Sequence, residues 1–335
     1  MNKIIVLLCT VAALCFASCS IHVSKEVYNN SAEYAAGKYL QAEEYFKGSK
    51  LYPKDRAKAY QLYKESAEMN YAPAMYKLAG FYNVGDIVEK APQQYALWLT
   101  RAAQLGEDRA QNALGVCYET GNGISKDIAQ ARHWYEKAFE QGNTQALENL
   151  SFLCMSEKDT VGLKKYVPMG VEKGLSRCEF IMGMMYRDGV GVTTDSTKAE
   201  DLFTKAAEKG FAQAYSHLGV MQLDRDDYKS TMKSFMKALN LGDKHAYYNI
   251  GYLYEYGYGV EVDYAMASQY YQRALGYNNI NKPHALFHLG RMLYEGREGL
   301  KKDGQKGLDY IKRAVQMGDF EATEYDNEMN SNKNN

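Results

Sequence analysis

The stretch GYLYEYGYGV, residues 251–260, decides the fold, because related stretches recur along the chain. It closes a segment with helical spacing and carries Gly257 and Gly259 two residues apart. Glycines in such a loop either cradle a phosphate or turn the chain. The stretches GNGI at 121–124 and GVGV at 189–192 are its counterparts. Because a phosphate loop follows a strand and does not recur at regular intervals, we interpret all three stretches as turns.

Each turn is expected to join two helices. Its glycines supply the positive φ that ends the first helix, and an aspartate that follows accepts backbone N–H groups at the start of the second. In two shorter units the aspartate is kept although the glycines are lost. Where the aspartate is missing, at Ala91, the next residue is Pro92, which suits a first helical turn. The predicted capping residues are Asp127, Asp159, Asp195, Asp227 and Asp263.

Two templates alternate along the chain. In the first, alanine is followed five residues on by the glycine of an LG pair or a close equivalent, and then by tyrosine three residues later, with weaker copies; the residues at the glycine position are 79, 115, 151, 183, 219, 251 and 290. The second template is shown by Ala131, Tyr135, Ala138 and Gly142. Their spacing places the first three side chains on one helical stripe and the glycine at the helix end. We therefore predict helix pairs whose small residues let the two backbones approach closely.

The elements LGxxY, GxGVxxD and AxxxYxxAxxxG resemble the Sel1-like repeats, which are related to the tetratricopeptide repeats. The resemblance covers residues 33–322. It implies an all-α fold, a right-handed α-solenoid (superhelix) of about eight helix-turn-helix repeats, of which the first is degenerate. The closing proline of tetratricopeptide repeats is absent. Residues 323–335 are expected to form a polar flexible tail.

The N-terminus is similar to the signal of a bacterial lipoprotein. A lysine precedes an apolar run over residues 4–16, which is too short to span a bilayer comfortably. The tetrapeptide FASC, which ends at Cys19, resembles a lipobox with Phe in place of the usual Leu. We expect a signal peptide at 1–18, lipidation of Cys19 and a tether at 19–32, which implies a place in the periplasm or outer membrane of the cell envelope. Cleavage after Ala17 is the alternative.

The composition, with 46% hydrophobic and 24% charged residues, is that of a folded soluble body. A formal net charge of -1 leaves no positive excess for a phosphate backbone, so nucleic acid is not an expected partner. The 30 tyrosines suit either buried packing or an exposed binding face. Beyond Cys19, the cysteines Cys117, Cys154 and Cys178 have no paired spacing; we interpret them as small buried residues, with at most one disulfide among them.

Two motifs are candidates for chemistry. His284 and His288 have the spacing of two metal ligands on one helix face, but no glutamate completes an HExxH motif, so no metal or other cofactor is predicted. Ser230 and Lys233 match the SxxK motif of serine acyl-enzymes such as penicillin-binding proteins, but no SDN or KTG element accompanies them. We predict no catalytic residue.

The resemblance also implies a binding face. In related arrays the first helices of the pairs line a concave groove. By analogy with tetratricopeptide repeats, groove positions lie three before the repeat glycine and one, four and five after it, and they include Glu119 and Glu255. Their aromatic residues and arginines are typical of interface anchors, although packing between repeats would also use them. The predicted binding residues are Tyr76, Asn112, Phe180, Arg187, Tyr248, Tyr252, Tyr256, Phe287, Arg291 and Tyr294.

The sequence thus predicts a non-enzymatic scaffold or adaptor that binds a protein or peptide in this groove and is tethered to a membrane through Cys19. Two alternatives stay open. One is a serine acyl-enzyme at Ser230 and Lys233, and the other is a glycan- or peptidoglycan-binding lipoprotein that uses the tyrosines.

Overall fold

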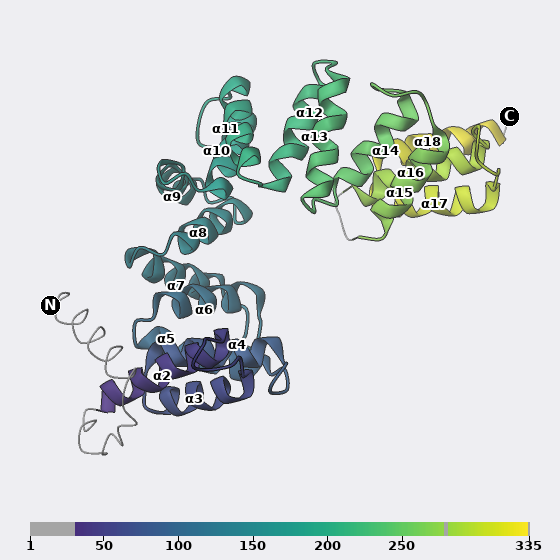
Figure 1. Cartoon of the computed structure of the whole chain (residues 1–335). Helices are drawn as coiled ribbons and strands as arrows, with labels where there is room; N and C mark the ends of the chain where they lie inside the picture. Colours follow the sequence, from purple (N-terminus) through teal and green to yellow (C-terminus); the bar gives the residue numbers. More distant parts are fainter. Residues whose placement is uncertain (1–30, 278–280, 334–335) are drawn as a thin grey trace. The chain divides into compact units, whose positions relative to one another are not determined.

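The computed structural model describes residues 31–277 and 281–333, and every regular element in these ranges is an α-helix (Figure 1). The predicted signal peptide, Cys19 and nearly all of the tether lie outside the described residues. No helix within the described ranges combines the length and the apolar character needed to span a bilayer. Contacts divide the chain after Ala146 into two compact units.

In the first unit each helix packs against the next one along the chain. Figure 1 shows this succession in purple to blue. The helices are α2 (Ser31–Lys47), α3 (Arg56–Glu68), α4 (Ala72–Val84), α5 (Pro92–Gln104), α6 (Asp108–Thr120) and α7 (Ile128–Glu140).

The second unit follows the same rule from α9 onward, and α16 also contacts α18. Packing between neighbours along the chain is the arrangement of an α-solenoid, so the predicted all-α architecture of stacked helix pairs is confirmed. The helices are α8 (Thr144–Ser156), α9 (Thr160–Glu172), α10 (Ser176–Asp188), α11 (Ser196–Glu208), α12 (Ala212–Leu223), α13 (Tyr228–Asn240), α14 (Ala246–Tyr256), α15 (Tyr264–Leu275), α16 (Lys282–Glu295), α17 (Gly304–Gln316) and α18 (Phe320–Lys333).

Aspartates cap the second helices of the pairs. Asp127 Oδ1 accepts the backbone N–H of Gln130 at 3.0 Å, and the other four predicted aspartates make the same contact with the residue three positions on. Asp55 and Asp303, which the sequence patterns did not identify, also cap helices in this way. The prediction for α5 is confirmed as well, because Pro92 is its first residue.

The two glycines of GYGV have different structural roles. Gly257 ends α14 in the left-handed conformation, with φ 72°, and its N–H bonds to the carbonyl of Leu253. Gly259 also has a positive φ, and a Cβ there would lie 2.7 Å from Cβ of Tyr228 in the preceding pair. The first glycine therefore turns the chain and the second permits a close approach. In the two shorter units Lys158 and Asp226 take the left-handed conformation instead.

A ring lies over four of the repeat glycines, while at Gly290 the nearest atoms are the Gly307 carbonyl oxygen and Ile311 Cγ1. A Cβ added to Gly115 on α6 would lie 2.5 Å from Cε1 of Tyr135 on α7, so the ring occupies the space that a side chain would need. Where residue 79 is alanine, the corresponding residue of the next helix is Leu99, which is smaller than a ring. The same contact pairs Gly183 with Phe203, Gly219 with Phe235 and Gly251 with Tyr271.

The C-terminal segment differs from the prediction. A polar flexible tail was expected from residue 323, but α18 continues to Lys333. Its inner face explains the difference, because Ala322 is fully buried and the Tyr325 hydroxyl donates to Glu295 Oε1 on α16 at 3.0 Å. These contacts stabilise the helix against the last pair, and the polar residues occupy its outer face.

Replacing Gly115 with alanine is expected to lower the free energy of unfolding by about 1–3 kcal/mol, because the new methyl group overlaps the Tyr135 ring. The matched control is Gly80→Ala on α4, where a Cβ meets nothing within 4 Å. That change should leave stability unchanged or raise it by up to about 1 kcal/mol. Chemical denaturation of the full chain measures both, and equal stabilities for the two variants would contradict the packing account.

Candidate interaction surface

Glu255 is a buried carboxylate that joins three helices. It stands on α14, four residues after Gly251, and is 6% exposed. Its Oε2 accepts the Tyr271 hydroxyl of α15 at 2.7 Å, and its Oε1 accepts Arg291 Nη2 of α16 at 2.6 Å. His288 Nδ1 lies 2.9 Å from Oε2. Burial alone would raise the pKa of Glu255, but these three groups outweigh burial and hold the pKa below its ordinary value.

Above this network lies a row of five rings, which we call the tyrosine strip: Tyr228, Tyr248, Tyr252, Tyr256 and Tyr258. The ring centroids are 4.9 Å apart for Tyr228 and Tyr258, and 5.9 Å for Tyr258 and Tyr256. They are 4.6 Å apart for Tyr256 and Tyr252, and 6.2 Å for Tyr252 and Tyr248. Tyr256 is 39% exposed and the other four side chains are half-buried. The strip thus presents partly exposed, mutually packed rings to solvent.

Arg291 supports the strip from one side. Its Nη2 donates to the Tyr256 hydroxyl at 2.9 Å as well as to Glu255, and its guanidinium lies 5.3 Å from the ring centre of Phe287. Burial, together with the neighbouring tyrosines and carboxylates, raises the pKa of Tyr252 to about 12. Tyr252 therefore keeps its hydroxyl proton at neutral pH, and Arg291 holds Tyr256 in position from beneath the strip.

Three of the predicted binding residues are buried in the protein interior. Phe287 is 2% exposed and packs on Tyr325, while Phe180 is 6% exposed and packs on Phe211 at 4.9 Å. Asn112 is buried on α6 of the first unit. We remove these residues from the candidate surface, because groove periodicity alone did not distinguish a ring that faces solvent from one that faces the next helix.

The remaining predicted residues do not join the strip. Tyr76, in the first unit, carries Arg109 over its ring at 5.0 Å. Tyr294 is half-buried and packs on the cluster formed by α16, α17 and α18. Arg187 donates from Nε and Nη2 to both carboxylate oxygens of Asp188, and its Nη1 lies 2.6 Å from Nδ1 of His217. Only Tyr248, Tyr252, Tyr256 and Arg291 of the predicted set come together.

The two histidines have carboxylate neighbours. His284 Nδ1 lies 2.6 Å from Asp319 Oδ2, and His288 Nδ1 lies close to Glu255. Within residues 31–277 and 281–333, no group of three or more His, Cys, Asp or Glu side chains is arranged to hold a metal ion. Both histidines thus contribute to packing between α14, α16 and α18.

Ser230 lies in the first turn of α13 and takes part in its cap. Its backbone N–H donates to Asp227 Oδ1 at 3.2 Å, and interaction with Ser230 lowers the pKa of Asp227. Lys233 is exposed on the same helix. A nucleophilic serine needs a general base as its hydrogen-bond partner. At Ser230 the backbone N–H donates to the capping carboxylate of Asp227, so Ser230 contributes to the N-terminal cap of α13.

The cysteines Cys117, Cys154 and Cys178 are buried, and none of them forms a disulfide within the described residues. Burial raises the pKa of Cys117 and of Cys178 to about 11, so neither is a thiolate at neutral pH. This agrees with their interpretation as small core residues.

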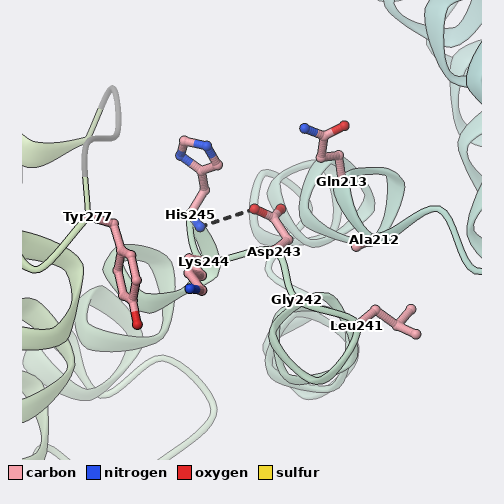
Figure 2. Close-up of a pocket in the computed structure, with 8 residues that line it drawn as sticks. All are labelled: Ala212, Gln213, Leu241, Gly242, Asp243, Lys244, His245 and Tyr277. Atoms are coloured by element: carbon pink, nitrogen blue, oxygen red, sulfur yellow. Dashed lines mark hydrogen bonds between the residues drawn. The ribbon is translucent and has the colours of Figure 1, made fainter. Parts of the chain in front are cut away.

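A separate shallow hollow lies where α12 and α14 begin and α13 ends (Figure 2). Its buried Asp243 accepts the Ser216 hydroxyl at 2.5 Å and the His245 backbone N–H at 3.0 Å. Lys244 lies 4.0 Å from the ring centre of Tyr277. The polar groups of Asp243 are thus used within the protein, where they order the start of α14.

One recurring contact escaped the sequence patterns. The tyrosine that covers a repeat glycine also donates its hydroxyl to a glutamate four residues after that glycine, as Tyr135 does to Glu119 at 2.6 Å. Tyr271 and Glu255 repeat the contact. Where the ring is Phe203, the corresponding residue is Arg187 instead of a glutamate. In the sequence, glutamate thus accompanies a covering tyrosine and is replaced where the covering ring is phenylalanine. This shared change indicates that such glutamates support the fold.

A family model for the Sel1 repeat matches residues 30–71, 72–107, 108–143, 176–211, 244–275 and 283–319, which is more than half of the chain. The chain belongs to the Sel1 repeat family. The unmatched stretches 144–175 and 212–243 hold the shortened turns, in which Lys158 and Asp226 replace the glycines.

Sel1 repeat relatives include a chitin synthase regulator of Malassezia restricta, 30% identical over 39% of this chain and 9% of that protein. An ERAD-associated E3 ubiquitin-protein ligase component of Candida glabrata is 24% identical over 77% of this chain and 33% of that protein. An uncharacterized protein of Neisseria meningitidis is 27% identical over 62% of this chain and 44% of that protein. The chain spans less than half the length of each of these relatives.

Two solved structures share the fold. A protective antigen present in uropathogenic Escherichia coli strains gives a TM-score of 0.63 at 25% identity, over 85% of this chain and 62% of that one. A Sel1 repeat protein from Oxalobacter formigenes gives a TM-score of 0.58 at 24% identity, over 89% of this chain and 88% of that one. Both support the assignment to a Sel1 repeat solenoid.

The His217 ring makes stability depend on pH. Burial, and then the charge of Arg187, lower the pKa of His217 to about 4, so the folded protein holds the ring neutral. An unfolded chain protonates it near pH 6.5. The unfolded chain therefore binds more protons than the folded protein below about pH 6.5. The contribution of His217 to the free energy of unfolding is fully present above about pH 6.5 and is lost as the pH falls towards 4. His217→Asn, the residue type at positions 149 and 249, should flatten the decline between pH 6.5 and 5 in denaturation midpoints. Parallel declines in the two proteins would contradict this assignment.

Proposed function

We propose that this Sel1 repeat protein is a non-enzymatic scaffold that binds a protein or peptide partner on the tyrosine strip. The observation that carries the proposal is the combination of partly exposed rings with a buried network beneath them. Tyrosine offers a large amphipathic contact area with few rotatable bonds, and the contacts of Tyr256 with Arg291 reduce its freedom further. A fixed aromatic surface of this kind loses little entropy when a partner binds.

The relatives support a role in partner binding. Among them are proteins named as a chitin synthase regulator and as a component of an E3 ubiquitin-protein ligase, and both names describe action through another protein. Repeat arrays in general present extended surfaces of this type. The capping role of Ser230 favours binding over acyl transfer.

We also propose that the protein is tethered in the cell envelope through a lipid on Cys19. The support is the order of a lysine, an apolar run and the tetrapeptide FASC at the N-terminus. A tether of this length would hold the helical units close to a membrane surface and leave the strip accessible to a partner.

Site-specific photocrosslinking in intact cells tests the binding site. A photoreactive amino acid in place of Tyr252 is expected to give a discrete crosslinked product, because the ring lies in the strip and is partly exposed. The matched control places the photoreactive amino acid at Tyr277. This exposed side chain lies outside the strip, and Lys244 lies over its ring. Products of equal yield at both positions, or none at Tyr252, would place the binding site elsewhere.

The anchor is checked on the same preparation. The mature protein should begin at Cys19 and carry the mass of attached acyl chains, and Cys19→Ser should release it from the membrane fraction. A mature protein that begins at Ser18 without added mass would show that an ordinary signal peptidase removes the leader.

A further inference from the structure

Several partly exposed rings of this chain are covered by its own cations, but the strip is not. Lys237 lies 5.0 Å from the ring centre of Tyr215, and Lys244 lies 4.0 Å from that of Tyr277. Among the residues that the structure describes, no lysine or arginine lies over any of the five rings of the strip; Arg291 reaches Tyr256 only at its hydroxyl. Tyr228 and Tyr256 each stack on Tyr258, so the ring surface left for a cation from another molecule is the part that reaches solvent, which is largest at Tyr256.

Carboxylates flank the strip at both ends. At one end the exposed Asp226 accepts the Tyr228 hydroxyl at 2.5 Å. At the other, the exposed Glu321 of α18 is close enough to Tyr248 and Tyr252 that its charge adds to the effect of burial in raising their pKa values. The contact of Tyr325 with Glu295 holds α18 in this position.

Acidic groups beside the strip outnumber cations, with Asp226, Glu255 and Glu321 against Arg291 and the exposed Lys229 that follows Tyr228. The charge of Glu255 is matched by Arg291 through a 2.6 Å contact. Neither Asp226 nor Glu321 forms an ion pair with another described residue, whereas the nearby Arg225 is paired with Glu200. Two acidic groups beside aromatic faces create an attractive potential for a positively charged ligand and a repulsive one for an acidic ligand.

We propose that the tyrosine strip binds a positively charged, arginine- or lysine-containing segment of the partner. The inference rests on the proposed function and names the chemistry of the partner. One cationic side chain packs on the solvent-exposed ring surface of Tyr256 beside Tyr252, and its neighbours pair with Asp226 and Glu321. Arginine suits the site best, because its planar guanidinium stacks on a ring while it donates to a carboxylate.

A matched pair of peptides tests this on the full chain. A short fluorescent peptide with several arginines is compared with the same peptide carrying citrulline, which keeps the shape of arginine and removes its charge. Fluorescence anisotropy should show binding of the arginine peptide that is at least about tenfold tighter than that of the citrulline peptide, and weaker binding at higher salt.

Variants locate the site. Tyr252→Leu and Tyr256→Leu should each weaken binding of the arginine peptide about fivefold, the loss expected for one cation–π contact. Glu321→Gln should weaken it and reduce its salt dependence. Tyr277→Leu, at an exposed ring that already carries Lys244, should bind the peptide as the unchanged protein does. Unaltered denaturation midpoints would show that the variants are folded.

Several outcomes would overturn the inference. Equal binding of the two peptides, no binding of the arginine peptide, or equal effects of Tyr277→Leu and Tyr252→Leu would each do so. If Tyr252 still crosslinks to a protein in cells, the proposed function stands and only the partner's charge is wrong. If cell-wall glycan fragments bind in a Tyr252-dependent manner and neither peptide does, both the inference and the proposed protein partner are wrong.

Discussion

The contact between an aromatic ring and a repeat glycine is the constraint on which the rest of the structure depends. Because Gly219 has no side chain, Phe235 of the next helix lies against the backbone of α12. The helix pair can then pack at short range, and the same geometry recurs at Gly115, Gly183 and Gly251. The turns serve this contact. Aspartate caps and left-handed residues fix where each helix begins and ends, and therefore which ring meets which glycine.

The candidate surface is held in place by residues that take part in the same ring–glycine contact. When the covering ring is Tyr271, its hydroxyl reaches Glu255, and the buried charge of Glu255 in turn requires Arg291 and His288. Arg291 then fixes Tyr256 in the strip. Packing in the core thus positions aromatic rings at the surface. Pairs built on Phe203 or Phe235 have no hydroxyl to offer and develop no such network.

The sequence predicted the fold well because its signals are local. Glycines at fixed intervals, the capping aspartates and the small residues at 115 and 219 each act within one helix pair, and repetition made them visible. It predicted the surface less well. Phe287 and Tyr252 both fit the groove periodicity, yet one ring is buried against α18 and the other is partly exposed. That difference depends on α18, most of which was expected to be a flexible tail from residue 323, because Tyr325 gives no periodic signal in a polar segment.

A double-mutant cycle at Gly219 and Phe235 tests the central claim most directly. Gly219→Ala and Phe235→Leu should each lower the free energy of unfolding. The loss in the double variant should be smaller than the sum of the two single losses by at least about 1 kcal/mol, because leucine makes room for the new methyl group. The natural combination of Ala79 with Leu99 shows that the fold accepts such an exchange. If the two losses add, the ring and the glycine do not determine each other, and the account of the fold is wrong.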